Sequence, residues 1–280
     1  MQRKTLLTVL FLLLCSFSTG TLSARPVKVL AIGNSFSEDA LEQYMHSIAD
    51  ATDTELVIGN LYHPGCSVER HFENITLDRG DYNYRKIMPD GRVDTIPQAR
   101  LAQALADEEW DIITFQQASH FSGMYPTFDD LKPLMAQVRK QVGEKPEFYW
   151  HMTWAYSPDS KHDGFKNYGN DQDKMYVAIV RAVEKMLADN PEIKGIIPTG
   201  TAVQNARQTA LGKDLTRDGY HMSLKEGRFI ASATWLKALF GKDVPFYKGH
   251  PDWLTPQELE IIVKAVDDAV ANPFVVTSPD

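Results

Sequence analysis

The chain has 280 residues, with 29 Lys and Arg against 37 Asp and Glu, which gives a formal net charge of −8. An acidic chain without clustered Lys and Arg is unsuited to neutralising a row of phosphates, so we do not expect a nucleic acid as partner. The length suffices for one large α/β domain with a substantial core.

Residues 1–24 have the pattern of a secretory signal peptide. Two basic residues, Arg3 and Lys4, precede an apolar run over residues 6–17, and a small-residue site ends at Ala24. The apolar run is too short for a membrane span, so we expect cleavage after Ala24 and no stable membrane insertion. Residues 25–280 then form a single domain that is secreted or reaches the periplasm.

The cysteines bear on localisation and on stability. Cys15 follows Leu14, whereas lipid attachment needs a small residue at that position, so we do not expect a lipoprotein. Once residues 1–24 are removed, Cys66 is the one remaining cysteine. An intramolecular disulfide is then impossible, and the core alone must hold the fold.

Short β-branched runs alternate with amphipathic segments along the chain. This alternation predicts a parallel sheet covered by helices on both faces, a flavodoxin-like three-layer α/β/α sandwich. The expected strands are Val27–Ile32, Glu55–Asn60, Asp111–Phe115, Phe148–Met152 and Gly195–Ile197. The expected helices place apolar residues at three- and four-residue spacing and are Glu38–Ala51, Ile96–Glu109, Phe128–Val142, Met175–Asp189 and Leu224–Phe240.

Two further segments carry local signals of their own. Residues 66–95 are polar and aromatic with a turn signal at Asp90-Gly91, which predicts an excursion with a small hairpin that could overhang the site. Residues 255–258, Thr-Pro-Gln-Glu, have the form of a capping box with Pro at the first helical position. They predict a final helix that runs through about Ala271.

Ser35 directly follows the first expected strand. Ligands bind at the carboxyl edge of an open parallel sheet, and a serine there can attack an ester while its backbone N–H stabilises the oxyanion. Ser35 and the nearby Ser37 also fit an ordinary helix N-cap, so neither residue alone establishes a nucleophile.

Asp218 and His221 lie on one short loop before the expected helix at Leu224. A serine hydroxyl is a poor nucleophile without a base. His221 can accept its proton, and Asp218 can fix the imidazole tautomer and stabilise the imidazolium that forms. Each residue alone also fits an ordinary surface loop, but the combination with Ser35 predicts a catalytic triad.

The motifs GNSFS near the start and DGYHMSLKEGRFIAS near the end resemble the first and last blocks of the SGNH (GDSL-like) hydrolases. The resemblance covers nearly the whole chain after residue 24 and implies a serine esterase. The runs WDIITFQQASHFSG and WHMTWAY add a similarity to a subfamily of SGNH-like proteins from gut Bacteroidetes that carries a domain-of-unknown-function label.

The resemblance also implies an oxyanion hole. The run HPGCS at residues 63–67 is similar to the second block, whose glycine donates its N–H, so this role transfers to Gly65 beside Ser35. The third block normally supplies an asparagine, and none follows the third expected strand here. Related sialate and xylan acetylesterases have a Gln-Gly pair at this location, so we expect Gln117 to be the third donor. Its rivals are Gln116 and His120.

Three residues at or just beyond the end of the fourth expected strand are candidates for substrate binding. His151, Trp154 and Tyr156 are expected near Ser35, where the aromatic rings could stack on sugar rings, although core or rim packing fits them equally well. The eight histidines show no metal-ligand spacing, so we expect neither a metal nor a cofactor.

Together these features predict a secreted serine esterase that hydrolyses O-acyl, above all O-acetyl, esters on carbohydrates. A lipid or other ester is the alternative within the enzyme class and would need an apolar channel. A weakly active or inactive glycan-binding protein on the same scaffold is the alternative outside it, because the third-block asparagine is missing. A nucleotide binder would need a Gly-rich phosphate loop, which the first strand lacks.

Overall fold

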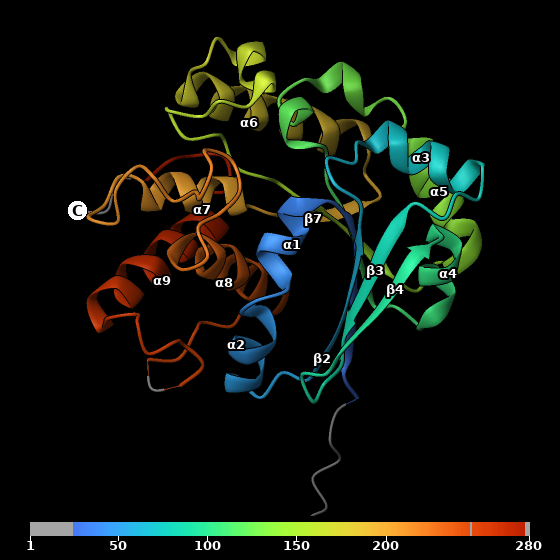
Figure 1. Ribbon diagram of the computed structural model, residues 1–280, viewed down its shortest axis with the longest axis horizontal. Helices are drawn as coiled ribbons and strands as arrows, with labels where there is room; N and C mark the ends of the chain where they lie inside the picture. The colour runs from blue at the N-terminus through green and yellow to red at the C-terminus, as the bar shows by residue number, and fades with distance from the viewer. Residues whose placement is uncertain (1–24, 247, 278–280) are drawn as a thin grey trace, which may run out of the picture.

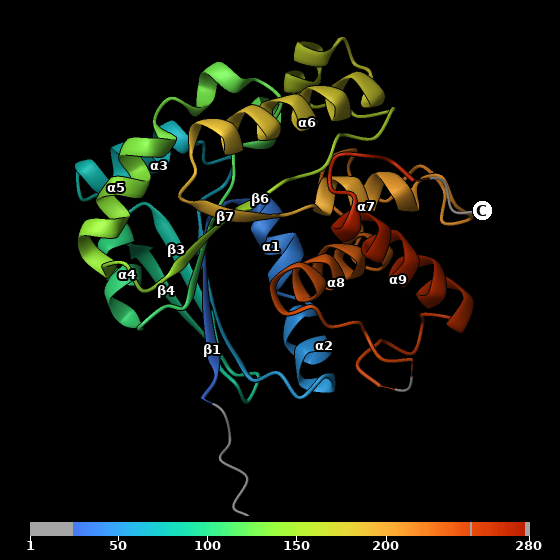
Figure 2. The ribbon, with the colours of Figure 1, turned by 180° about the vertical axis from the view of Figure 1, so that it is seen from behind.

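A computed structural model describes residues 25–246 and 248–277, and Figures 1 and 2 show it from opposite sides. The expected signal peptide and Cys15 lie outside the described residues. The described residues form a seven-stranded sheet in the order β4-β3-β2-β1-β5-β6-β7. Its strands are β1 (Val27–Gly33), β2 (Leu56–Tyr62), β3 (Tyr82–Ile87), β4 (Val93–Ala99), β5 (Ile112–Phe115), β6 (Glu147–His151) and β7 (Ile193–Ile197).

The sheet is mixed but mostly parallel. β1 pairs in parallel with β2 on one side and with β5 on the other, and β6 and β7 continue in parallel beyond β5. β3 and β4 pair antiparallel at the other edge. The predicted α/β class and its five parallel strands are therefore confirmed, and the expected hairpin becomes two outer strands of the same sheet.

Helices cover both faces of the sheet. Figures 1 and 2 show α1, α2, α8 and α9 on one side and α3, α4 and α5 on the other. The helices are α1 (Ser35–Leu41), α2 (Met45–Ala51), α3 (Val68–Thr76), α4 (Leu101–Asp107), α5 (Leu131–Val142), α6 (Gln172–Asp189), α7 (Thr199–Ala206), α8 (Glu226–Phe240) and α9 (Pro256–Ala271). Short 3-10 turns occupy Ser119–Phe121, Tyr125–Phe128 and Asp163–Tyr168. α9 begins with the predicted capping box at Thr255 and Glu258.

Two expected helices differ from the structure. The helix expected over Ile96–Glu109 begins only at Leu101, because Ile96–Ala99 belong to β4 and pair with β3. The single helix expected over Glu38–Ala51 is two shorter helices separated by a turn at residues 42–44. Local apolar spacing could not reveal the strand at Ile96–Ala99, because its pairing with β3 overrides the helical pattern.

The central strands are enclosed on both faces, and their carboxyl ends meet at one edge. Every residue of β5 is buried, as are the last five residues of β1, as expected for a parallel strand between two helical layers. From β1 the chain leads through α1 and α2 to β2 on one side, whereas β5 lies on the other side, so β1 and β5 flank a topological switch point. Among the described helices, none combines the length and apolar character that a membrane span requires.

Candidate active site

Ser35 occupies the first turn of α1, immediately beyond the carboxyl end of β1. Asn34 is the N-cap, and its side-chain Oδ1 accepts a hydrogen bond from the Phe36 N–H at 3.0 Å. The turn that enters the helix is tight: a Cβ on Gly33 would lie 2.2 Å from the Ser37 Oγ. Glycine is therefore needed at this position for the chain to place Ser35 at the sheet edge.

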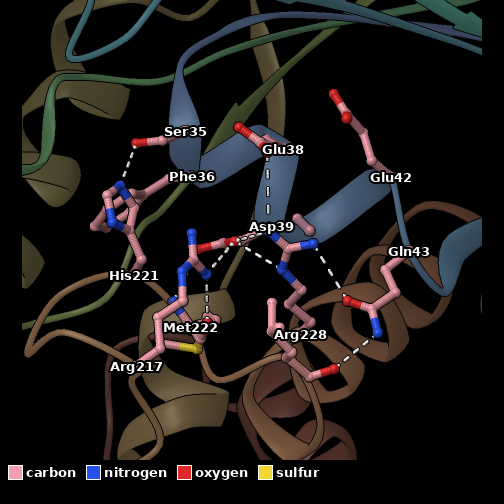
Figure 3. Close-up of polar contacts among 12 residues, drawn as sticks. Ser35, Phe36, Glu38, Asp39, Glu42, Gln43, Arg217, His221, Met222 and Arg228 are labelled. Atoms are coloured by element: carbon pink, nitrogen blue, oxygen red, sulfur yellow. Dashed lines mark hydrogen bonds and ion pairs between the residues drawn. The ribbon is translucent and has the colours of Figure 1, made fainter.

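Ser35, His221 and Asp218 are joined by hydrogen bonds (Figure 3 shows the Ser35–His221 contact). The His221 Nε2 lies 2.9 Å from the Ser35 Oγ, and its Nδ1 lies 2.7 Å from the Asp218 Oδ2. The Asp218 Oδ1 also accepts the backbone N–H of His221 at 2.8 Å. The structure thus brings the three predicted triad residues together in nucleophile, base and carboxylate order.

The Asp218 carboxylate is held in its charged form. Burial on its own would raise its pKa, but hydrogen bonds from the His221 ring and from the backbone N–H groups of His221 and Tyr220 outweigh it, and the pKa lies below its usual value. An ionised Asp218 selects the tautomer with the proton on Nδ1. The Nε2 of His221 is then free to accept the Ser35 proton.

The second serine of the motif is not available for catalysis. Ser37 is fully buried, and its Oγ lies 2.8 Å from both the Asn34 carbonyl oxygen and the Asn60 Oδ1. Ser35 is partly exposed and has the base beside it. The structure therefore resolves the alternative between the two serines in favour of Ser35.

The backbone N–H groups of Ser35 and Gly65 are the two predicted backbone donors to an oxyanion. Gly65 lies in the turn after β2 with φ +60° and is exposed. Neither the Ser35 nor the Gly65 N–H has a backbone acceptor among the described residues. Both predicted backbone donors thus keep a free N–H at the carboxyl edge of the sheet.

Asn34 connects the nucleophile turn to both neighbouring loops. Its Nδ2 donates to the Cys66 carbonyl at 3.0 Å and to the Gln117 carbonyl at 3.4 Å, while its Oδ1 also accepts from the Gln116 Nε2 at 2.5 Å. One buried amide thereby fixes the loops after β1, β2 and β5 relative to one another. Sequence reasoning overlooked Asn34, although it directly precedes the predicted nucleophile.

The side chain of Gln117 is fully occupied elsewhere. Its Nε2 donates to the Thr127 carbonyl at 2.8 Å and lies 3.1 Å from the Thr127 Oγ1, and its Oε1 accepts from the Val68 and Ala118 N–H groups. This geometry contradicts its assignment as the third oxyanion donor: the buried amide stabilises the loops instead. Of the two rivals, Gln116 bonds Asn34, and its Oε1 lies 2.8 Å from the His151 Nδ1. His120, half-buried on the loop after β5, stays a candidate.

Comparison with known proteins identifies the family of the chain. The family model described as "Domain of unknown function (DUF4886)" matches residues 28–269. The chain belongs to the DUF4886 family. The chain is similar to a DUF4886 protein from Bacteroides uniformis whose crystal structure is known, with 42% sequence identity and a TM-score of 0.87. The match covers 90% of this chain and 98% of that one.

A second solved structure extends the likeness to the SGNH fold. A protein from Slackia heliotrinireducens, described as an SGNH hydrolase, has a TM-score of 0.51 at 19% identity, over 76% of this chain and 99% of that one. No curated protein matches the chain. The predicted resemblance to SGNH hydrolases and to a domain-of-unknown-function subfamily is thus confirmed, and this DUF4886 protein has the SGNH hydrolase fold.

The aromatic residues expected to bind substrate are buried in this DUF4886 protein. His151, Trp154 and Tyr156 are each at most 1% exposed, so the prediction that they form a sugar-stacking rim is wrong. The chain after β6 passes beneath residues 217–222, which carry Asp218 and His221 and are called the triad loop below; there the Ser157 N–H donates to the Gly219 carbonyl at 2.8 Å. The triad loop therefore packs on Trp154 and Tyr156 through Tyr220, whereas His151 is enclosed by Gln116, Thr199 and Trp235.

Trp154 supports the triad from below. Its ring stacks on Phe36 with centroids 4.1 Å apart and an interplanar angle of 5°, and its Nε1 donates to the Tyr220 carbonyl at 2.7 Å. Phe36 follows the nucleophile and Tyr220 precedes the base, so one indole ring packs against both catalytic segments. Trp154 therefore has a structural role at the site that the sequence did not distinguish from substrate binding.

Partly exposed rings lie beside the base instead. Tyr220 lies 4.1 Å from the His221 ring, His162 lies 4.7 Å from Tyr220, and His120 lies 5.8 Å from His162, all between ring centroids. We call Tyr220, His162 and His120 the ring wall. Burial lowers the pKa of both histidines, assisted by their mutual proximity for His120. Burial therefore favours the neutral form of both rings. Sequence reasoning did not identify His162 or Tyr220, whose segments meet only in the fold.

The described ranges contain no group of three or more His, Cys, Asp or Glu side chains arranged to hold a metal ion. The site holds a serine hydroxyl hydrogen-bonded to an imidazole, and two backbone N–H groups without a backbone acceptor among the described residues.

Burial of His151 makes the stability of the fold depend on pH. Burial lowers its pKa from 6.5 to about 3, and the ring lies between the Gln116 Oε1 and the Thr199 Oγ1. In the unfolded chain the ring takes up a proton near its usual pKa. Between about pH 6 and pH 3 the unfolded state therefore binds one more proton, and this contribution to stability is lost as the pH falls through that range.

We expect His151→Gln to have a lower free energy of unfolding than the wild type near pH 7. The difference between the two free energies should become smaller as the pH falls. The variant lacks the titrating ring, so the difference in unfolding free energy should shrink by about 1.4 kcal/mol per pH unit below about pH 6. Urea unfolding of both proteins at several pH values measures this difference in free energy. A difference that stays constant down to about pH 4 would show that His151 is not kept neutral by the fold.

Proposed function

We propose that this protein is a serine esterase that hydrolyses O-acyl, above all O-acetyl, esters on carbohydrates. The observation that carries the proposal is the continuous hydrogen bonding from Ser35 through His221 to Asp218, with distances of 2.9 and 2.7 Å. The likeness to a structure described as an SGNH hydrolase supports the same reaction class. A degenerate scaffold used only for binding would have no need to keep this geometry.

The reaction follows from the positions of these groups. The Ser35 Oγ attacks the ester carbonyl while the His221 Nε2 takes its proton, and Asp218 stabilises the imidazolium. The N–H groups of Ser35 and Gly65 stabilise the negative oxygen of the tetrahedral intermediate. His221 then returns the proton to the leaving alcohol, which leaves an acyl group on Ser35. Water attacks this acyl group with His221 as base, releasing the acid and restoring Ser35.

The ring wall supports a carbohydrate as the alcohol part of the substrate. Aromatic faces pack on the C–H faces of pyranose rings, and the His162 Nδ1 accepts the Gly164 N–H at 3.0 Å, which assigns the ring proton to Nε2 as a donor for hydroxyl groups. A hollow of about 310 Å³ lies between the loops after β2 and β5. Five of its seven lining residues are polar or charged, in the set Ser67, Glu69, Phe121, Pro126, Thr127, Asp129 and Asp130. This polarity favours a polyhydroxylated substrate over an acyl lipid.

Location is a further part of the proposal. A signal peptide at residues 1–24 would carry the enzyme to the periplasm or outside the cell, where acetylated polysaccharides are met. The expected products are acetate and a deacetylated glycan, and the reaction uses water and no cofactor.

Ser35→Ala should abolish hydrolysis, because no other described hydroxyl lies within reach of the His221 Nε2. We expect the purified protein to release acetate from p-nitrophenyl acetate and from acetylated xylan, and the variant to be at least about 10³-fold slower on both. Circular dichroism checks that the variant is folded. Equal acetate release by both proteins would refute the assignment of Ser35, and release by neither would favour a glycan-binding role.

His162→Asn should weaken the use of a sugar ester while sparing a small ester. Asn can still cap the Asp163–Tyr168 turn through its side-chain oxygen, so the variant removes the ring but not the cap. We expect kcat/KM to fall by about tenfold for acetylated xylo-oligosaccharides, because one stacked ring contributes about 1 kcal/mol or slightly more. The value for ethyl acetate, which has no ring to stack, should change less than about twofold. An equal loss on both substrates would contradict sugar binding at the ring wall.

A further inference from the structure

A fully buried carboxylate lies one helical turn beyond the nucleophile. Asp39 belongs to α1 and is 0% exposed. Figure 3 shows it facing the segment that carries His221. Its Oδ1 accepts the Arg217 Nη1 and the Arg228 Nε, each at 2.8 Å, and its Oδ2 accepts the Met222 backbone N–H at 2.8 Å. A carboxylate removed from water is stable only when paired in this way.

The contacts of Asp39 fix the residue that follows the base. Met222 donates its N–H to Asp39, and its carbonyl accepts the Arg217 Nη1 at 2.6 Å. Arg217 is bound to the same loop by its own N–H, which donates to the His221 carbonyl at 2.9 Å. Both backbone polar groups of Met222 are thus held by one ion-paired cluster, and His221 has little freedom to shift along the loop.

The cluster and the catalytic hydrogen bond connect the same two segments. Ser35 and Asp39 are four residues apart and share one face of α1. Ser35 contacts His221 and Asp39 contacts Met222, so α1 and the loop meet at two points about one helical turn apart. The second contact fixes the loop whether or not the Ser35 hydrogen bond is made. That bond must break during catalysis, so an independent contact is needed to keep the base in place.

We propose that Asp39 is a positioning residue that sets the distance between the Ser35 Oγ and the His221 Nε2. It acts through the Met222 N–H and through Arg217, and it touches neither substrate nor the reacting atoms. The inference rests on the proposed esterase function, because its effect on the reaction is measured as turnover.

Glu42 offers a matched control at the end of the same helix. Its carboxylate is also ion-paired, with both oxygens 2.9 Å from the Arg85 Nη1. Its Oε1 also accepts a hydrogen bond from the Asn60 Nδ2 at 2.6 Å. Arg85 lies on β3 and Asn60 on β2, so this ion pair connects the helix to the sheet and not to the triad loop. Removing its charge should lower stability without moving His221.

The experiment compares Asp39→Asn with Glu42→Gln in the whole chain. A displacement of the base by about 1 Å costs about 10²-fold in rate, so we expect Asp39→Asn to lower kcat by about that factor on p-nitrophenyl acetate with KM within about twofold. Glu42→Gln should keep kcat within about twofold even if its melting temperature falls equally. Arg217→Met serves as a milder second variant, should Asp39→Asn fail to fold, with an expected loss of about tenfold in kcat.

Hydrogen exchange of the peptide that spans residues 217–222 gives a readout that does not require turnover. Exchange there should become faster in Asp39→Asn and in Arg217→Met and stay unchanged in Glu42→Gln. Two results would overturn the proposal. One is a folded Asp39→Asn variant with the kcat of the wild type. The other is a loss of kcat in both Asp39→Asn and Glu42→Gln that follows the fall in melting temperature of each variant. If the wild type hydrolyses no ester, the proposed function fails, and unchanged exchange in Asp39→Asn would then separately refute the positioning role.

Discussion

The arrangement depends on a hydrogen bond between two residues that are 186 positions apart, Ser35 and His221. A single such bond contributes only about 1 kcal/mol net, far too little to order two distant segments. The fold must therefore bring them together by other means. The sheet places Ser35 at the carboxyl end of β1, Asp39 links α1 to Met222, and Trp154 packs against Phe36 while it bonds the Tyr220 carbonyl.

A layer of buried polar side chains beneath the site gives the loops their positions. Asn34, Gln116, Gln117 and His151 are all buried, and each forms hydrogen bonds to a neighbouring loop or strand end. A buried amide that loses a partner is costly, so this network tolerates few alternative loop arrangements. The surface above it, with the exposed Gly65 turn and the ring wall, is less constrained and can meet a substrate.

Local sequence signals predicted the elements that local chemistry decides. The β-branched runs found the five parallel strands, and the Thr255 to Glu258 box found the start of α9. The triad was predictable because its residues lie in two short motifs. The burial of Trp154 and Tyr156 was not, because it depends on the triad loop, more than sixty residues later, passing over them. Gln117 was misassigned for the same reason: its partners, Val68 at the start of α3 and Thr127 in the 3-10 turn Tyr125–Phe128, are brought to it only by the fold.

If Ser35 is a nucleophile activated by His221, a reagent that reacts with activated serines should modify it covalently. The full chain would be treated with an alkyl fluorophosphonate, which reacts with activated serines, and the adduct located by peptide mass spectrometry. We expect one adduct per chain, on Ser35, and none in His221→Ala. An adduct on Ser37 or another serine, or no adduct on a protein that still turns over esters, would contradict the role of Ser35 as nucleophile.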